Sequence, residues 1–434
     1  MPRLASLLHL ALVAFLLFAF FATSRSQAQA SSAQLGSNTL SQLPGTWENI
    51  HLGAIGGSFQ PVNRLDASPL VGFVMWGTPP SRYLSGVVNH AHYCKWGQAT
   101  ATSPDINWFK RNHPDWLSYT NDRKTLAYYR YGNLVDYAHA PLDFTNPAVQ
   151  DLVINQCLLP ALSQRYAAVG FDHVTTLNHF LVAGHYTRDG QWVQMFSGKL
   201  SDETYRKAMK NAFATLTAKM KSVAQQKGKT IAIAINCYPN LQYNDHYTDL
   251  LPYADIVLDE AGFTKLGNTI FPYLTDTPVT GTNITDAWLT KINDLWTLQH
   301  KFGKPLIING LVPYPVGATH LPKQRDIQWI LANYLLVKEA YTYCSFISSV
   351  FDRYRQLNVS LPEYFAQVGH PHSALYQDQN VYMRDYSNGL AIVNPSLDQS
   401  YTVTLPANTY EDLNGHAITT VTMQPYSGLV LVKI

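Results

Sequence analysis

The stretch Ala254–Thr264, which reads ADIVLDEAGFT, decides the fold that we expect for this chain. A short apolar run, with helical patterns on both sides, ends here in two adjacent carboxylates, Asp259 and Glu260. Such a run is typical of a buried parallel strand, and parallel α/β folds bind their ligands at the carboxyl ends of the strands. Gly262 then allows a tight turn. The stretch therefore predicts a parallel sheet with an acidic side chain at its edge.

Strand-like and helical patterns alternate on both sides of this stretch. We expect eight strands, at residues 70–76, 90–96, 125–130, 171–177, 230–236, 254–260, 305–312 and 341–348. The helical patterns cover residues 105–111, 147–166, 201–226, 286–302 and 323–340. Eight strands interleaved with helices over roughly 280 residues are typical of a (β/α)8 or TIM barrel. An open doubly wound sheet is the main alternative, but no Gly-x-Gly-x-x-Gly turn follows the first strand.

The two ends of the chain differ from this central part. Residues 1–30 combine Arg3, a long apolar run and Ala28-Gln29-Ala30, which is the layout of a secretory signal peptide. An uncleaved N-terminal anchor is the alternative, and no later apolar run approaches the length of a membrane span. Residues 31–65 are rich in Ser, Gln, Gly and Asn, which predicts a segment that wraps or stays loose. Residues 377–434 alternate with period two between Asn-Gly, Pro and Ser-Gly turns.

These patterns divide the chain into four parts. We expect a signal peptide at 1–30, an N-terminal segment at 31–65, the (β/α)8 TIM barrel at 66–376 and a small sandwich-like C-terminal antiparallel β-domain at 377–434. The signal peptide predicts a secreted or periplasmic protein.

Composition excludes several classes of partner. Removal of residues 1–30 takes away two arginines and leaves 29 basic and 29 acidic residues, so there is no basic excess for nucleic acid or an anionic membrane. Charged residues make up only 14% of the chain, whereas Tyr (27) and Trp (9) are plentiful, which suits flat, neutral ligands such as sugar rings. The four cysteines are widely spaced and leave disulfides and buried thiols as equal alternatives.

Polar and aromatic side chains stand where the expected strands end. They are Trp76, Trp96, Arg130, Asn178, Asn236, Asp259, Glu260 and Asn309. Because a barrel interior rejects unpaired polar groups, we expect them to bind or act on a substrate at one rim.

Two carboxyl groups, one protonated and one ionised near neutral pH, are the usual requirement for glycoside cleavage. Asp259 and Glu260 are adjacent on a strand and point to opposite faces, so they cannot form that pair. Glu260 is the expected catalytic acid and should face the opening, with Asp259 against the helices; the reverse, with Asp259 as the catalytic acid, is the alternative. Asp172 is a further candidate, with loop bracing as the alternative; Asp143 is expected to brace a turn, and Asp352 to form a rim salt bridge with Arg353.

A metal site is the remaining chemical alternative. His90, His92 and Cys94 share one face of a strand, but no further ligand follows at a suitable spacing, so we expect no metal. No Gly-x-Ser-x-Gly elbow or phosphate-binding loop occurs, and no cofactor is expected.

Several segments in fixed order resemble a known family. They are NWFKRNHPDWL, PLDFTNPAVQDLV, AAVGFDHV, ADIVLDEAGF, ILANYLLVKEAYTY and NGLAIVNPS. The chain from about residue 70 to its end resembles the putative (hypothetical) glycoside hydrolases with an endo-polygalactosaminidase-like TIM barrel. The resemblance implies a barrel with acids at the ends of the fourth and sixth strands, and the sixth-strand acid corresponds to Glu260.

The chain departs from this resemblance at the fourth strand. Relatives typically read Gly-[Tyr/Phe]-Asp-Gly-Val-x-x-Asp-Asn, and here the matching stretch is GFDHVTTLN, with Leu177 in place of the expected Asp. Leucine can neither donate a proton nor attack a sugar. Either another acid, Asp172, Asp143 or Asp352, supplies the second carboxylate, or the protein binds glycan without cleaving it. Three readings follow: a secreted glycoside hydrolase that acts on a neutral or amino-sugar polysaccharide, a catalytically inactive glycan-binding barrel, and an unrelated, metal-assisted barrel enzyme.

Overall fold

The structure is a computed structural model of the 434-residue chain. It describes residues 50, 52–55, 71–75, 90–96, 98–100, 105–131, 134–137, 139–172, 174–236, 247–260, 262–266, 269–270, 284–312, 324–348, 362–407 and 409–434. The predicted signal peptide, residues 1–30, lies outside the described residues.

A parallel sheet of eight strands forms the centre of the molecule. Its spatial order is β2-β1-β17-β16-β13-β12-β9-β3, and every recorded pairing is parallel. The strands are β1 Leu52–Ile55, β2 Val71–Met75, β3 Ala91–Lys95, β9 Ala168–Asp172, β12 Ala232–Asn236, β13 Ile256–Asp259, β16 Leu306–Val312 and β17 Thr342–Ser348. The first strand thus pairs with the last, and the Cα atoms of β2 and β3 approach within 8 Å. The fold is an α/β, TIM-barrel-like fold.

The two faces of the sheet carry separate apolar clusters. The inner face holds Phe73, Met75, Ala91, Ala168, Ala232, Ala234, Ile256, Leu258, Ile307 and Tyr343. The alternate residues, such as Val169, Ile233 and Val257, face outward into a larger core with the helices. Because side chains alternate along a strand, this division fixes which strand-end residues point into the sheet's concave interior.

Helices cover the outer face. They are α3 Pro147–Val153, continued by the π-helical turn η4 Ile154–Leu158 and by α4 Leu159–Ser163, then α5 Glu203–Gln226, α7 Ile284–His300 and α8 Gln324–Val337. Short 3-10 turns η5 Tyr247–Asp249, η6 Leu251–Tyr253 and η7 Gly262–Thr264 flank β13, followed by the small hairpin β14 Lys265–Leu266 and β15 Thr269–Ile270. No helix among the described residues is both long enough and apolar enough to cross a membrane.

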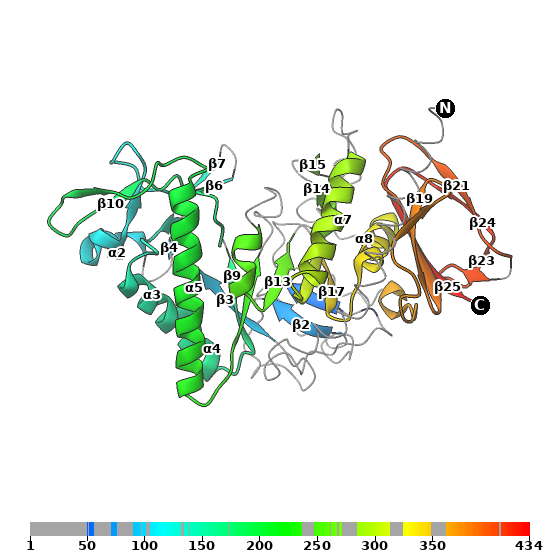
Figure 1. Ribbon diagram of the computed structural model, residues 1–434, viewed down its shortest axis with the longest axis horizontal. Helices are drawn as coiled ribbons and strands as arrows, with labels where there is room; N and C mark the ends of the chain where they lie inside the picture. Colours follow the sequence, from blue (N-terminus) through cyan, green and yellow to red (C-terminus); the bar gives the residue numbers. More distant parts are fainter. Residues whose placement is uncertain are drawn as a thin grey trace, which may run out of the picture.

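Two insertions build a small unit that we call the rim module, residues 98–146 and 174–202. Its elements are β4 Gln98–Thr100, α2 Ile106–Asn112, η3 Pro114–Trp116, β5 Ser118–Tyr119, β6 Tyr129–Tyr131, β7 Leu134–Asp136, β8 His139–Pro141, β10 Gly184–Tyr186 and β11 Trp192–Gln194. The insertions follow the carboxyl ends of β3 and β9, and β5 pairs with β10 across them. The rim module therefore belongs to the face of the sheet where the strands end, and it extends to one end of the molecule (Figure 1).

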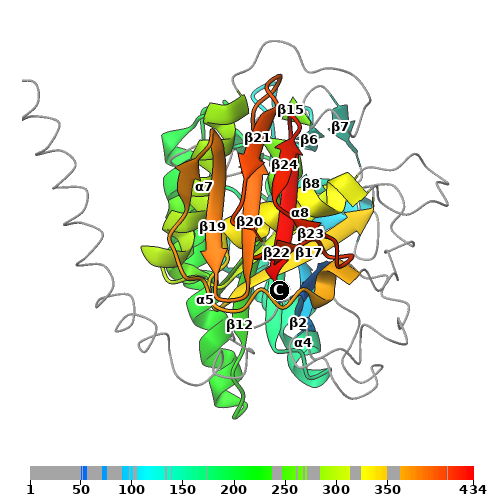
Figure 2. The ribbon, with the colours of Figure 1, turned by 90° about the vertical axis from the view of Figure 1, so that its right-hand side faces the viewer.

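An antiparallel β-domain closes the chain, as the period-two pattern predicts. It consists of β18 Tyr376–Asp378, β19 Val381–Tyr386, β20 Gly389–Asn394, β21 Tyr401–Thr404, β22 Tyr410–Glu411, β23 Ala417–Ile418, β24 Thr420–Met423 and β25 Ser427–Lys433, preceded by η9 Pro362–Phe365. Six strands form one sheet in the order β18-β19-β20-β25-β22-β23, and β21 pairs with β24. Seen from its own side, the β-domain lies in front of α8 (Figure 2).

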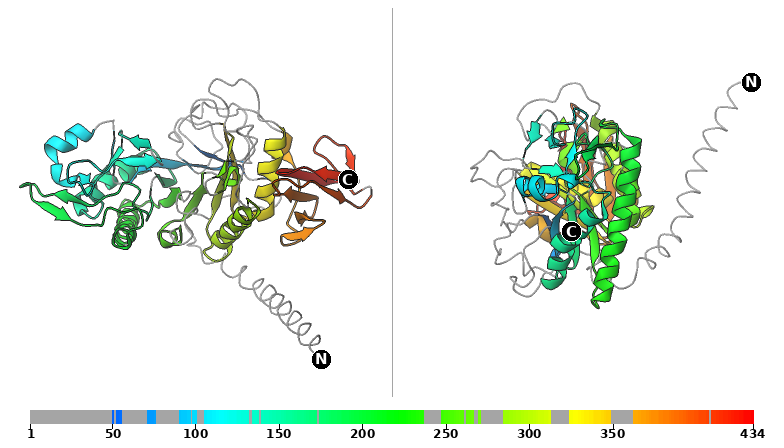
Figure 3. Two further views of the ribbon diagram at one scale, coloured as in Figure 1. Left: turned by 90° about the horizontal axis from the view of Figure 1, so that it is seen from above. Right: turned by 90° about the vertical axis from the view of Figure 1, so that its left-hand side faces the viewer.

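Helix α8 lies between the central sheet and the β-domain, so every residue from Asp326 to Val337 is buried. A Cβ on Gly428 of β25 would come within 2.6 Å of the Gln328 carbonyl oxygen, so glycine allows this close approach. Viewed from above, the rim module, the central sheet and the β-domain follow one another along the long axis (Figure 3).

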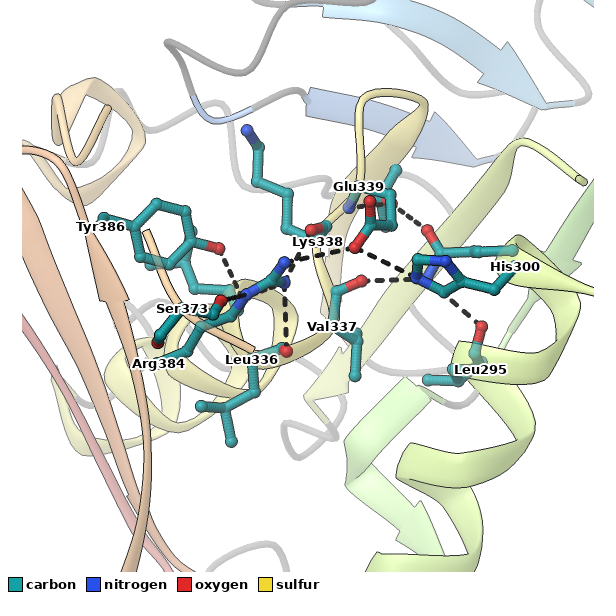
Figure 4. A network of polar contacts seen from close by, with 12 residues as sticks. Leu295, His300, Leu336, Val337, Lys338, Glu339, Ser373, Arg384 and Tyr386 are labelled. Carbon is teal, nitrogen blue, oxygen red and sulfur yellow. Dashed lines mark hydrogen bonds and ion pairs between the residues drawn. The ribbon is translucent and has the colours of Figure 1, made fainter. Parts of the chain in front are cut away.

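Arg384 of β19 ties the β-domain to the end of α8. Its Nη1 donates to the carbonyl oxygens of Leu335, Leu336 and Lys338, at 3.3, 3.2 and 2.8 Å, and its Nη2 pairs with Glu339 at 3.2 Å (Figure 4). Carbonyl groups in the last turn of a helix have no partner within the helix, and a cation there also favours the helix dipole. Arg384 thus provides both hydrogen-bond donors for the free carbonyl groups and a positive charge at this buried helix end.

Three sequence predictions about the strands are wrong in detail. Residues 125–130 do not contribute a strand to the parallel sheet, because residues 129–131 form β6 in a hairpin with β7. The eighth strand of the sheet is instead β1, which pairs with β2 and lies within the segment 31–65 that we expected to wrap or stay loose. The barrel-like sheet therefore begins before residue 66. The fourth predicted strand, 171–177, is displaced: β9 ends at Asp172.

One disulfide joins the sheet to the helical layer. Cys94 of β3 is bonded to Cys157 of η4, and Cys344 is a buried free thiol. Cys237 lies outside the described residues. The sequence left the cysteine pairing open, since the two bonded residues are 63 positions apart.

Candidate active site

Alternation along the strands brings a group of polar side chains together at the carboxyl ends of four neighbouring strands. Side chains an even number of residues apart on a strand face the same side. Asp172 therefore faces the same side as Ala168, which is on the inner face. Asn236 likewise faces the side of Ala234, and Glu260 the side of Leu258. Tyr93 of β3 shares the parity of Ala91. These four side chains belong to β3, β9, β12 and the residue after β13, which are adjacent in the sheet.

Asn236 lies between the two carboxylates and binds both. Its Nδ2 donates to Oε2 of Glu260 at 2.6 Å and to Oδ1 of Asp172 at 3.3 Å. These two distances add up to 5.9 Å, so the two carboxylate oxygens lie no farther apart than that. The Tyr93 hydroxyl donates to the other oxygen of Asp172 at 3.0 Å. The result is one hydrogen-bonded chain, Tyr93–Asp172–Asn236–Glu260.

The surroundings of Glu260 favour its protonated form. Burial raises the pKa of its carboxyl group, the negative charges of Asp172 and Asp259 raise it further, and the Asn236 hydrogen bond lowers it in part, so that the pKa is about 7 instead of 4.5. A carboxyl group with this pKa carries its proton through most of the range below neutral pH. Glu260 is therefore able to act as a general acid.

The backbone around Glu260 is fixed by the neighbouring strand. Asn309 of β16, which is fully buried, donates from Nδ2 to the carbonyl oxygen of Glu260 at 2.6 Å. Gly262 has a φ of +49°, and a Cβ there would come within 2.4 Å of the Asn309 carbonyl oxygen. Glycine is thus needed for both the turn and the close contact that hold Glu260 at the strand end.

Asp259, the other acid of the pair in sequence, points the opposite way. It is fully buried on the helical side, where its Oδ2 lies 2.5 Å from Nζ of Lys291 in α7, and its Oδ1 accepts from the Gly262 amide at 3.2 Å. This places Asp259 in a structural ion pair and not beside a substrate.

Asp172 is at the end of its strand, whereas the sequence analysis placed it near the beginning. The difference follows from the true bounds of β9, in which Gly170 lies within the strand and not before it. The shift moves Asp172 to the carboxyl end of the sheet, beside Asn236. Leu177 is buried in the loop that follows β9.

The site also contains residues that sequence reasoning missed. Tyr93 and Lys95 lie on the inner face of β3, and Lys95 is the Cα partner of Asp172 in the parallel ladder. His139 of β8 brings its Nε2 into direct contact with Lys95 Nζ. The alternation of side chains along β3 could have identified Tyr93 and Lys95. The metal-site interpretation considered His90, His92 and Cys94 instead, which lie on the outer face of the strand.

Other predicted binding residues lie elsewhere. Trp96 is buried among Phe171, Phe213 and Met209, to whose sulfur its Nε1 donates at 3.2 Å, so it belongs to the core under α5. Asn178 is fully buried and braces its own loop through Val182. Trp76 and the side chain of Arg130 lie outside the described residues, as do Asp352 and Arg353.

Two further interpretations concern bracing and metal binding. Asp143 accepts hydrogen bonds from Thr145 and lies 3.1 Å from Nδ1 of His185, which braces the turn before α3. In the part of the chain that the structure describes, no three His, Cys, Asp or Glu side chains are grouped so as to hold a metal ion.

Comparisons with known proteins give structural likeness only. No family model and no curated protein matches the chain. The glycoside hydrolase domain of PelA from Pseudomonas aeruginosa is 14% identical, with a TM-score of 0.41 over 68% of this chain and 94% of that chain. The maltogenic α-amylase AmyB from Thermotoga neapolitana is 12% identical, with a TM-score of 0.47 over 88% and 98%. The α-amylase of Geobacillus thermoleovorans is 12% identical, with a TM-score of 0.44 over 90% and 99%.

Likeness at these levels carries no argument about this chain. The strand order of the chain itself defines its fold, and the side chains at the strand ends define its candidate site.

Proposed function

We propose that the chain is a glycoside hydrolase that cleaves a neutral or amino-sugar polysaccharide, with Glu260 as the general acid and Asp172 as its partner carboxylate. The observation that carries the proposal is the pair itself: two carboxylates bridged by one Asn236 amide, one of them with its pKa raised to about 7. Glycoside cleavage requires two carboxyl groups in different surroundings, so that one is protonated and the other ionised at the same pH. The proposal includes closure of the sheet into a barrel between β2 and β3, supported by the pairing of the first strand with the last.

We assign a distinct role to each group. Glu260 holds a proton near neutral pH and gives it to the glycosidic oxygen as the bond to the anomeric carbon breaks. Asp172, oriented by Tyr93 and Asn236, attacks that carbon and forms a glycosyl ester. The Glu260 carboxylate then takes a proton from a water molecule, which attacks the ester, releases the sugar and restores both groups.

The spacing of the pair favours retention of configuration. Retaining glycosidases have their carboxyl groups about 5–5.5 Å apart, and inverting enzymes leave about 6.5–9.5 Å for a water molecule. The upper limit of 5.9 Å between Oδ1 of Asp172 and Oε2 of Glu260, the two oxygens that Asn236 binds, falls below the inverting range.

A polysaccharide panel with matched variants tests the proposal. Reducing ends released by the wild type should fall by about 10²–10⁴-fold in Glu260→Gln and in Asp172→Asn, whereas Glu203→Gln and Asp151→Asn, whose carboxylates are 80% and 56% exposed, should leave the rate unchanged. The rate of the wild type should also fall as the pH rises above about 7, because Glu260 loses its proton. Undiminished cleavage in Glu260→Gln would contradict the assigned role.

The inactive, glycan-binding alternative rested on the absence of an acid at position 177. Because Asp172 reaches Asn236 and Glu260, the site already contains two carboxylates, and that argument no longer favours binding without cleavage. A wild type that binds a polysaccharide but releases no reducing ends would restore it.

The proposal also includes export through the signal peptide at residues 1–30. The Cys94–Cys157 disulfide supports it, because disulfides persist in oxidising compartments. N-terminal sequencing of the exported protein should begin at Ser31.

A further inference from the structure

Aromatic side chains are grouped across the rim module. We call Tyr137, Tyr128, Tyr119, Tyr186 and Trp192 the aromatic row. Ring contacts join its members in an edge-to-face manner, with centroids 5.1 Å apart for Tyr128–Tyr137, 5.4 Å for Tyr119–Tyr186 and 5.2 Å for Tyr186–Trp192. The row comes from three separate segments of the chain, so neighbours in sequence do not explain it.

The two halves of the row are joined through the backbone. The Ala127 amide donates to the carbonyl oxygen of Ser118 at 3.0 Å, which brings Tyr128 beside Tyr119. The pKa of Tyr119 is accordingly raised, first by burial and then by the hydroxyl groups of Tyr186 and Tyr128. The row thus consists of two groups of rings in contact, Tyr137–Tyr128 and Tyr119–Tyr186–Trp192, which come from neighbouring backbone segments.

One end of the row is connected to the site through His139. Tyr137 precedes His139 by two residues, a distance of at most roughly 7 Å along an extended chain, and the His139 ring contacts Lys95, the ladder partner of Asp172. The other end, with Tyr186 on β10, belongs to the part of the rim module at the end of the molecule opposite the β-domain, where Figure 1 labels β10. The row thus leads away from the site.

The rings remain accessible to a ligand. Tyr137 is 70% exposed, and the other four are partly exposed. Aromatic side chains with one apolar face and one polar tip suit a ligand that offers C–H surfaces and hydroxyl groups together, as a pyranose ring does. The only cation stacked on a ring of the row among the described residues is Arg123, over Trp192 at 5.5 Å, so the greater part of the row is uncharged.

We propose that the aromatic row is an extended binding track for a polysaccharide chain, which seats several sugar units beyond the one that is cleaved. This inference rests on the proposed function for its ligand class, and it predicts that the protein prefers long chains over short ones.

The test measures binding in a variant that cannot turn over its ligand. The full chain with Glu260→Gln is run in native gels that contain soluble starch, galactomannan or glycol chitosan, and the polymer that retards it is then titrated as its hexasaccharide and its disaccharide. We expect the hexasaccharide to bind more tightly than the disaccharide. Tyr137→Ala should weaken the binding of the hexasaccharide by about tenfold, the equivalent of one aromatic contact. The affinity for the disaccharide should not change.

Matched variants separate the track from general damage. Tyr137→Trp should keep the affinity for the hexasaccharide, and Phe365→Ala, which removes a 52% exposed ring of η9 outside the row, should match the parent. Equal hexasaccharide affinity in the parent and in Tyr137→Ala, or no retardation by any of the three polymers, would overturn the track.

The outcomes also separate the track from the proposed hydrolysis. Binding that depends on Tyr137, without reducing-end release by the wild type, keeps the track and rejects the hydrolase. Cleavage that is lost in Glu260→Gln but unchanged for long chains in Tyr137→Ala keeps the hydrolase and rejects the track.

Discussion

Replacement of Glu260 by glutamine should change how folding stability depends on pH. The carboxyl group of Glu260 has its pKa raised from 4.5 to about 7 in the folded protein, mainly by burial. A group with a raised folded pKa stabilises the protein fully below its unfolded pKa, and this contribution is lost as the pH rises through the folded pKa. The wild type should therefore lose stability between about pH 4.5 and pH 7.

The size of this loss follows from the same two values. Each pKa unit corresponds to about 1.4 kcal/mol, so the ionised Glu260 destabilises the fold by about 3 kcal/mol at pH 8 relative to pH 4. Glutamine cannot ionise, so the free energy of unfolding of Glu260→Gln minus that of the wild type should increase by this amount from pH 4 to pH 8. The comparison between two pH values cancels the effects of the substitution that do not depend on pH.

Two assays measure the effect. Urea unfolding at intervals between pH 4 and pH 8 gives the stability difference, with Glu203→Gln as the control at an exposed carboxylate. Carbon-13 labelling of the carboxyl groups of the six glutamates allows the Glu260 resonance to be identified by its absence in Glu260→Gln. Stability curves that run parallel over the whole range, together with a Glu260 titration near pH 4.5, would refute the reasoning for a protonated acid at this site.

Three further predictions concern the framework of the site. Lys291→Met should lower the free energy of unfolding by about 3–5 kcal/mol in chemical denaturation, because Asp259 then remains as an unpaired buried charge; a loss below about 1 kcal/mol would contradict the ion pair. Gly428→Ala should lower the melting temperature, since the added methyl group meets the α8 backbone; a melting temperature equal to that of the wild type would show that the β-domain does not pack this closely. Loss of the Cys94–Cys157 bond by double serine substitution should lower stability by up to about 4 kcal/mol, as expected for a loop of 63 residues, and unchanged urea unfolding would argue against the bond.

The local pattern of the chain was sufficient for the elements with long, regular periodicity. The helices over 203–226, 284–300 and 324–337 and the antiparallel β-domain follow predicted patterns, because each buries a continuous apolar stripe or alternating face. Strand β1 escaped prediction because Leu52–Ile55 is only four residues long and its surroundings resemble a loop. Its place in the sheet depends on its partners β2 and β17, which are distant in sequence.

The candidate site shows the same division. The sequence by itself determined that an acid follows a buried strand at Glu260, and that Asp259 must face the opposite side, because alternation along a strand is a local property. Only the tertiary structure decided that Asp172 lies beside Asn236 and Glu260, since that depends on where β9 ends and on which strand lies beside it. The pKa of Glu260 belongs to the tertiary structure as well, because burial and the charge of Asp172 arise only when β9, β12 and β13 lie side by side.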